Sequence, residues 1–269
     1  MATIGFIGGG NMAEALIKGI LSAKVYQPKN IFVSDIKPER LKFLAQRYGV
    51  KTSGSNKELT AKVDIVILSV EPQHLNGILI DIKDSFKQDT LFISIAAGKR
   101  TQKIKELLGN VCVIRVMPNT PARIGQGLSG IYAPETAKAR LDEALSIFSS
   151  VGRAVVLENE DMLDCLTAVS GSGPAYFFLL MESMIQAAIE LGFTRQQAME
   201  LVLQTAKGSA LLAESAAAAG QSPAELREKI VSRGGTTEAA LKVFAEGNFT
   251  SLVNSAVKKA HARSKELST

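Results

Sequence analysis

The stretch TIGFIGGGNMAEAL, residues 3–16, decides the fold of the N-terminal half of the chain. Its apolar start predicts a buried strand, and NMAEAL predicts the first turns of a helix. Between them the sequence follows the pattern Gly8-x-Gly10-x-x-Ala13. The first glycine permits a tight turn, the second lets a pyrophosphate approach the backbone, and the small third residue lets helix and strand pack closely. This first glycine turn, residues 8–13, therefore predicts a dinucleotide site, with a βα turn of purely structural role as the alternative.

The same alternation continues through the N-terminal half. Helix-like stretches are separated by strand-like runs: NIFVSD (30–35), VDIVILSV (63–70), TLFISIAAG (90–98) and VCVIRVMP (111–118). Such runs are typical of parallel strands buried on both faces, and their alternation with helices predicts a doubly wound, Rossmann-type α/β domain. GLSGIYA (127–133) and RAVVLE (153–158) are candidates for two further strands.

The pattern changes after the last of these runs. From Asp161 onward helical signals replace strands, including capping boxes at Thr194 with Gln197 and at Ser222 with Glu225. Long helices are expected over residues 173–192, 195–217, 236–246 and 248–266. We therefore expect a Rossmann domain over residues 1–158 and an all-α C-terminal domain over residues 159–269.

The composition excludes several classes of protein. Hydrophobic residues make up 46% of the 269-residue chain, so a substantial core can be buried. The net charge is +5, but Lys and Arg are dispersed among acidic residues, which favours anionic small molecules over nucleic acid as partners. Cys112 and Cys165 stand among apolar neighbours, and His74 and His261 are far apart in the sequence. We therefore expect small core cysteines, no disulfide, no metal site and no Ser–His–Asp triad.

No segment of the sequence predicts membrane targeting. The start MATIGFIGGG has neither a basic region nor a long apolar run, so we expect no signal peptide and a cytoplasmic protein. The most apolar helical stretch, PAYFFLLMESMIQAAIELG (174–192), is barely long enough to cross a bilayer and carries Glu182 and Glu190. We expect it to be a buried helix of a soluble protein. The helical part has more apolar surface than one Rossmann face can cover, which predicts an obligate oligomer.

An acidic residue follows the second predicted strand. IFVSD ends in Asp35, about 20 residues after the glycine turn, where a carboxylate accepts hydrogen bonds from the ribose hydroxyls of NAD. That carboxylate would repel a 2′-phosphate, whereas Lys37 and Arg40 could neutralise one. The competing interpretation makes Asp35 the cap of a surface helix in DIKPER. The choice between NADH and NADPH stays open.

A second glycine-rich segment, SRGGTTEAAL, spans residues 232–241. Gly234 and Gly235 permit close backbone approach, and a helix that begins at Thr236 or Thr237 presents free N–H groups and a favourable dipole to an anion. This second glycine turn, residues 232–237, therefore predicts a site for a small anion. The alternative is an ordinary capped helix start.

Several stretches together resemble one family. GFIGGGNMAEAL, VEP (70–72), SIAAG (94–98), RVMPNTPARIGQG (115–127), SGSGPAY (170–176) and GGTTEAAL (234–241) occur in the order seen in pyrroline-5-carboxylate reductases. The match covers nearly the whole chain. The resemblance implies reduction of the cyclic imine 1-pyrroline-5-carboxylate to L-proline with NADPH or NADH, and a homodimer or higher oligomer with interleaved helical domains.

The resemblance also implies a role for individual residues. The pyrophosphate would be held by Gly8, Gly10, Asn11 and Met12, with Asn56 on the adenosine side. Val70 and Pro72 would form a turn under the cofactor, and Ala97 would lie near the nicotinamide. The substrate carboxylate would be received by Ser232, Gly234, Gly235, Thr236 and Thr237, and Glu160 would also approach that pocket. Thr237 would place its hydroxyl near the ring nitrogen, as the catalytic residue.

Two positions depart from the family pattern. Glu71 replaces the usual lysine of V-K-P and removes a positive charge near the cofactor. Arg233 stands where a proline is common, which changes the rigidity of the second glycine turn and adds a cation beside it.

Two other functions compete with imine reduction. Related two-domain β-hydroxyacid dehydrogenases place a general-acid lysine on the helix after a similar glycine turn, but here no Lys or Arg lies between Arg153 and Arg195. A protonated cyclic imine is already electrophilic at carbon, so Thr237 would serve first to orient it. A non-catalytic NAD(P)-sensing protein is the third possibility, and the intact GGTT segment argues against it.

Overall fold

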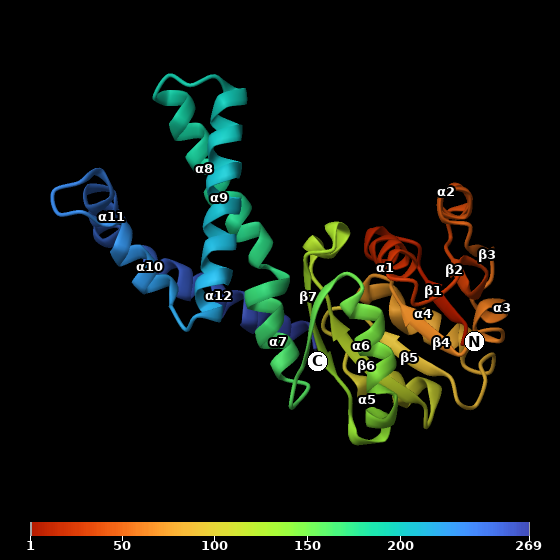
Figure 1. The fold of residues 1–269 in the computed structure, drawn as a ribbon. Helices are drawn as coiled ribbons and strands as arrows, with labels where there is room; N and C mark the ends of the chain where they lie inside the picture. The colour runs from red at the N-terminus through yellow and green to blue at the C-terminus, as the bar shows by residue number, and fades with distance from the viewer. Residues whose placement is uncertain (1, 269) are drawn as a thin grey trace. The chain divides into compact units, whose positions relative to one another are not determined.

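The structure is a computed structural model that describes residues 2–268 (Figure 1). Contacts between residues divide the chain into two units. Unit 1 comprises Met1–Pro174 and Lys259–Thr269, and unit 2 comprises Ala175–Lys258. This division falls later than the boundary expected at residue 158, because the segment that follows β8 packs against β6 and β7. The last helix begins in unit 2 and ends in unit 1.

Unit 1 is built on one twisted sheet. Within residues 2–268, eight strands pair in the order β3-β2-β1-β4-β5-β6-β7-β8. The strands are β1 (Ile4–Ile7), β2 (Ile31–Ser34), β3 (Lys51–Ser53), β4 (Ile65–Leu68), β5 (Leu91–Ser94), β6 (Cys112–Met117), β7 (Gly127–Tyr132) and β8 (Gly152–Val156). The doubly wound fold predicted from the sequence is confirmed, including the two candidate strands near its end.

The sheet departs from the expectation in two places. β7 runs antiparallel to β6 because the connection between them holds only the 3₁₀ helix η2 (Thr120–Ile124), too short for the crossover that a parallel pair needs. The short edge strand β3 was not predicted, since its residues Lys51, Thr52 and Ser53 carry no apolar signal.

Helices cover both faces of the sheet. They are α1 (Asn11–Ser22), α2 (Pro38–Tyr48), α3 (Asn56–Thr60), α4 (Pro72–Ile82), α5 (Thr101–Leu108), α6 (Leu141–Ser149) and α7 (Met162–Leu166), with 3₁₀ turns at Pro28–Asn30 and Glu135–Arg140. Alternate residues of β4 belong to different cores: Ile65 and Ile67 to one, Val66 and Leu68 to the other. Since successive strand residues point to opposite faces, the two cores lie on opposite sides of the sheet.

Unit 2 is entirely helical within its described residues. A π turn (Thr167–Gly171) leads into α8 (Gly173–Glu190), and α9 (Arg195–Ala218), α10 (Pro223–Ile230), α11 (Thr236–Glu246) and α12 (Phe249–Leu267) follow. The four long helices and both capping boxes are confirmed. Each box joins a hydroxyl to the backbone N–H three residues on and satisfies donors that a helix start leaves free.

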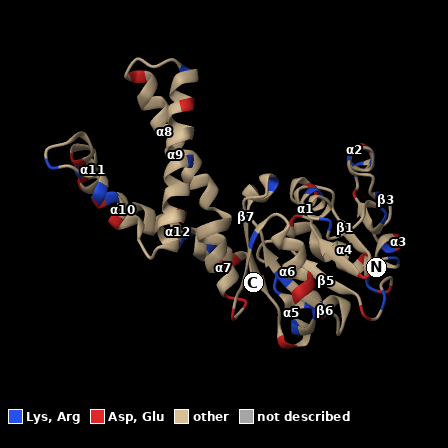
Figure 2. Cartoon of the chain, viewed as in Figure 1, with Lys and Arg blue, Asp and Glu red and all other residues tan. Residues whose placement is uncertain are grey.

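The prediction that the apolar helix is buried was wrong for the single chain. Among the described residues of α8 only Gly173 is buried, and Phe177 is 64% exposed. Charged residues are interspersed over unit 1, whereas α8 and α9 carry few (Figure 2). By length and composition alone, Met162–Glu190 could also cross a membrane. That indication is weak, because an apolar helix that packs against protein has the same composition.

Candidate functional site

The first glycine turn joins β1 to α1, and its glycines Gly8 and Gly10 lie in different surroundings. Gly8 has a φ of 94°, and a Cβ there would lie 2.5 Å from the carbonyl oxygen of Ser69. Gly10 is the exposed N-cap of α1, and a Cβ there would meet no atom within 4 Å. Gly8 is therefore required by the fold, whereas the open space at Gly10 fits the approach of a ligand to the backbone.

The hydrogen bonds of this turn leave donors for an anion. Asn11 and Met12 lie in the first turn of α1, where backbone N–H groups have no intrahelical partner. The N-cap Gly10 has no side chain that could accept from them. The neighbouring carbonyl oxygens are occupied, because Arg40 donates to Gly9 O at 2.5 Å and to Gly10 O at 3.3 Å. The turn thus presents N–H groups at the positive end of a helix, as a pyrophosphate requires.

Arg40 is committed to the protein rather than to a ligand. Besides the two carbonyls it contacts Glu14 at 2.5 Å, and both side chains are half-buried. Burial raises the pKa of Glu14, but hydrogen bonds from Arg40 and Tyr48 outweigh burial, so the pKa of Glu14 lies below its usual value. Lys37, in contrast, is exposed beside the turn. Of the two cations predicted to neutralise a 2′-phosphate, Lys37 is the one left accessible.

Asp35 is tied to the first glycine turn. Its Oδ2 accepts a hydrogen bond from Gly9 N at 2.7 Å, and its Oδ1 accepts one from Lys37 N at 2.9 Å. α2 begins after Lys37, which has no capping side-chain bond within the described residues, so Asp35 is not the N-cap of that helix. A half-buried carboxylate held by two backbone N–H groups remains able to accept from a ribose hydroxyl.

The predicted cofactor residues lie together at one edge of the sheet. Each follows the carboxyl end of a parallel strand between β1 and β5, and β1 and β4 flank the point where strand order reverses. Dinucleotides bind at such an edge in open α/β sheets. The residues gathered there are Gly8, Gly10, Asn11, Met12, Asp35, Lys37, Asn56, Val70, Pro72 and Ala97.

Asn56 is fixed from two sides. It is the first residue of α3, whose N-cap Ser55 accepts a hydrogen bond from Glu58 N. Its Oδ1 also accepts a bond from Ser34 Oγ at 2.7 Å. With Oδ1 engaged by Ser34, the side-chain amide nitrogen is the group of Asn56 that can donate to a ligand.

The second glycine turn lies in unit 2 and opens α11. Gly234 has a φ of 73°, and its N–H donates to Glu238 Oε2 at 2.6 Å. Gly235 is the N-cap of α11 and, within the described residues, has no side-chain capping bond. The N–H groups of Thr236 and Thr237 therefore lack intrahelical partners. A hollow of about 550 Å³ is lined by Gly234, Gly235 and Glu238, so the turn borders open space.

Glu160 is engaged within unit 1. Its carboxylate accepts from Thr101 N at 2.8 Å and from Thr101 Oγ1 at 3.1 Å, and it lies 3.3 Å from Arg115 Nη1. It thus caps α5 in unit 1, whereas the second glycine turn belongs to unit 2. Sequence reasoning missed its partner Arg115, although an arginine within the apolar run VCVIRVMP is a signal of a buried ion pair.

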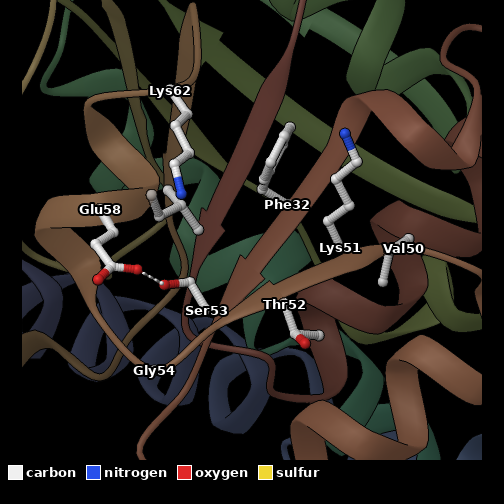
Figure 3. A pocket seen from close by; sticks show the side chains of 9 residues that line it. Phe32, Val50, Lys51, Thr52, Ser53, Gly54, Glu58 and Lys62 are labelled. Atoms are coloured by element: carbon white, nitrogen blue, oxygen red, sulfur yellow. Dashed lines mark hydrogen bonds between the residues drawn. The ribbon is translucent and has the colours of Figure 1, made fainter.

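Another hollow, of about 590 Å³, lies along the edge strand β3 (Figure 3). Ser53 Oγ donates to Glu58 Oε2 at 3.3 Å on one side of it. Its lining is Phe32, Val50, Lys51, Thr52, Ser53, Gly54, Glu58, Leu59 and Lys62, which includes none of the predicted site residues. The volume of a hollow therefore does not identify the candidate site in this protein.

The chain is similar to proteins of one family along its whole length. Residues 160–267 match the family model described as pyrroline-5-carboxylate reductase dimerisation, and residues 3–98 match NADP oxidoreductase, coenzyme F420-dependent. The pyrroline-5-carboxylate reductase of Pseudomonas aeruginosa is 43% identical over 98% of this chain and 96% of its own length.

Solved structures agree with the sequence comparison. The structure of a pyrroline-5-carboxylate reductase from Coxiella burnetii has a TM-score of 0.90 and 38% identity, covering 100% of this chain and 99% of the other. The Plasmodium falciparum pyrroline carboxylate reductase, solved with NADP bound, has a TM-score of 0.89 and 31% identity, covering 100% and 98%. The chain belongs to the pyrroline-5-carboxylate reductase family.

Proposed function

We propose that this protein reduces 1-pyrroline-5-carboxylate to L-proline with a hydride from NADH or NADPH, the last step of proline biosynthesis. The observation that carries the proposal is the pair of glycine-capped helices, α1 and α11, in a chain of this family. Two helix starts whose glycine N-caps supply no side-chain acceptor suit two different anions, a cofactor pyrophosphate and a substrate carboxylate.

The first glycine turn fits the cofactor. The open space at Gly10 and the free N–H groups of Asn11 and Met12 suit a pyrophosphate, and Asp35 suits the adenosine ribose. Lys37, which is exposed, would approach a 2′-phosphate if NADPH is used. When bound, the reduced nicotinamide supplies the hydride.

The second glycine turn would hold the substrate. The N–H groups of Thr236 and Thr237 would bind its carboxylate, with Ser232, Gly234 and Gly235 shaping the turn. The hydroxyl of Thr237 would hydrogen-bond the ring nitrogen and orient the imine carbon toward the hydride. The protonated imine nitrogen keeps its proton as it becomes the amine, so no lysine is needed as a general acid. Glu160 would act through the start of α5, which it caps, rather than by binding the carboxylate.

A homo-oligomer would cover the apolar face of α8. The chain carries the dimerisation region of its family, and Phe177 and Phe178 are more than half exposed in the single chain. We propose a homodimer or a larger assembly of the helical units, in the cytoplasm. Light scattering at micromolar concentration should give at least twice the mass of one chain, and a monomer would contradict the proposal.

The activity is tested by the decay of NAD(P)H absorbance with three additions: pyrroline-5-carboxylate, a panel of 3-oxo acids, and no substrate. We expect oxidation of the cofactor only with pyrroline-5-carboxylate, with proline formed in equal amount. Oxidation with a 3-oxo acid alone would favour the β-hydroxyacid dehydrogenase alternative. Cofactor binding without any turnover would favour a sensing protein.

A further inference from the structure

The end of α12 is held in unit 1 by a buried carboxylate. Asp164, in α7, is fully buried, and its Oδ1 accepts hydrogen bonds from Ser264 Oγ and from Ser268 Oγ, each at 2.8 Å. Both serines are themselves buried, at 6% and 8% exposure. Residues 264–268, here called the C-terminal turn, are therefore docked by specific polar contacts rather than by apolar burial alone.

The same carboxylate belongs to an ion-pair cluster that reaches α5. Arg115, 3% exposed on β6, lies 3.6 Å from Asp164 Oδ1 and 3.3 Å from Glu160 Oε1. Glu160 in turn accepts from the backbone N–H and hydroxyl of Thr101, the first residue of α5. One buried cation thus connects the C-terminal turn with the helix that follows β5.

The C-terminal turn also touches the turn that connects β5 to α5. Gly98 has a φ of 69°, and a Cβ there would lie 2.7 Å from both Cβ and O of Leu267. Gly98 is buried, whereas its neighbour Ala97 is half-buried. This turn follows the carboxyl end of β5, at the sheet edge where a dinucleotide binds. The backbone of Leu267 therefore supports the inner side of the turn, and Ala97 remains open to a ligand.

Stability alone does not explain this cluster. Replacing buried ion pairs by well-packed apolar residues is often neutral or stabilising, because charges are costly to remove from water. Asp164 adds a further cost, since its buried Oδ2 has no hydrogen-bond partner among the described residues. What such a cluster provides is a fixed geometry, because each hydrogen bond restricts the position of its partner.

We propose that the C-terminal turn is a positioning element for the nicotinamide end of the cofactor site, with Asp164, Ser264 and Ser268 as its positioning residues. The inference rests on the proposed function, which places the cofactor at the first glycine turn and Ala97 near the nicotinamide. Releasing residues 264–268 would free the turn at Ala97 and Gly98. The first glycine turn, Asp35 and Asn56 belong to other loops, so the adenosine half of the site would keep its contacts.

The test compares two ligands that differ only in the nicotinamide half. Dissociation constants of NADH and of ADP-ribose are measured by calorimetry for wild type and for the double variant Ser264→Ala/Ser268→Ala (with NADPH and 2′-phospho-ADP-ribose as the equivalent pair). We expect NADH to bind about tenfold more weakly to the variant and ADP-ribose to change less than about twofold. The turnover number of the double variant should also be lower than that of wild type, because its nicotinamide would be less well positioned.

The matched control is Ser255→Ala. Ser255 also lies in α12, but its hydroxyl donates to Ser251 O of its own helix. Both ligands should bind this variant as they bind wild type. If the double variant does not fold by circular dichroism, the single variant Ser268→Ala carries the test, with the same split at smaller size.

Equal loss of both ligands would show a general loosening of unit 1, and no loss of either would show that the C-terminal turn is not a positioning element. Either result overturns the inference. Wild type that binds NADH but does not reduce pyrroline-5-carboxylate would refute the proposed function and leave the ligand comparison valid.

Discussion

The N-cap glycines of the two glycine turns have similar backbone conformations, but the two turns differ in how closely the rest of the protein packs against them. Gly10 (φ −65°, ψ −172°) and Gly235 (φ −83°, ψ 171°) are both extended N-caps without a side chain. The first turn lies between buried parallel strands, and a Cβ on its Gly8 would collide with backbone. The second is largely exposed, and a Cβ on its Gly234 would meet nothing within 4 Å.

The comparison distinguishes the backbone N–H groups, which suit an anion, from the side chains, which would select one anion over another. Free N–H groups at a helix start are common to both turns and suit a small anion. Around the first turn, loops from neighbouring strands add Asp35 and Asn56, which suit a nucleoside. Around the second, Thr236 and Thr237 add hydroxyls, which suit a small polar ring. We expect these side chains, rather than the free N–H groups alone, to determine the ligand.

The largest effect is expected from Gly10→Ala in the first turn. The space is open and φ is negative, so the variant should fold, with a melting temperature lowered only slightly because alanine is a poorer N-cap than glycine. Its methyl group would occupy the path of the pyrophosphate, and we expect NAD(P)H affinity to fall on the order of 100-fold. Gly77→Ala, also at an open position, is the control. Unchanged cofactor affinity would show that no phosphate approaches Gly10.

A smaller effect is expected at Asp35, because it acts on one part of the cofactor. Asp35→Ser should lower KM for NADPH relative to that for NADH, by about tenfold in the ratio, since it removes the carboxylate facing a 2′-phosphate. Asp35→Asn removes the charge but keeps an acceptor for Gly9 N, so it should shift the ratio without weakening both cofactors. A ratio that does not move in either variant would assign the choice to Lys37.

The smallest effect is expected on the free energy of unfolding, through the contacts that anchor β1, the strand before the first glycine turn. Asp64 accepts two hydrogen bonds from Thr3, next to β1, and pairs with Lys87 at 2.7 Å. The Lys87 hydrogen bond lowers the pKa of Asp64 to about 2 from an ordinary 3.8, with burial opposing and the Thr3 bonds assisting. Because the folded pKa is the lower one, this stabilisation is full above pH about 4 and is lost as the pH falls toward 2.

The comparison for this strand is between wild type and Asp64→Asn. Urea midpoints at pH 7 and pH 3 should show that the variant is less stable at pH 7 and that the difference shrinks at pH 3. The effect should be small, since Asp64 is 39% exposed and the pair is screened by solvent. A difference that is constant with pH would mean that the carboxylate charge does not anchor β1.

Local patterns in the sequence were sufficient for much of the fold. α11 begins and ends where GGTT and the following glycine predict, at Thr236 and Glu246, because helix ends are determined by neighbouring residues. β3 was missed because three polar residues carry no periodicity and pair only because β2 is adjacent. α8 was expected to be buried, but its side chains are largely exposed in the single chain. Composition alone does not distinguish a helix of the core from a helix that packs against a second chain.

The candidate site was predictable to a similar extent. The residues of both glycine turns follow from motifs, since the backbone chemistry is encoded within a few positions. The hydrogen bonds of Asp35 to Gly9 and of Asp164 to Ser264 and Ser268 join residues far apart in the chain. Such contacts depend on the tertiary fold, and a single sequence contains no local signal for them.

The central claim, that the two glycine turns bind two different anions, is tested most directly by Thr237→Ala. The measurement is steady-state kinetics with pyrroline-5-carboxylate together with the dissociation constant of NAD(P)H for the same variant. We predict a turnover number lower by about one to two orders of magnitude, for loss of an orienting hydrogen bond, and an unchanged cofactor dissociation constant. Wild-type kinetics in a correctly folded variant would contradict the account, because the second glycine turn would then be only a helix start.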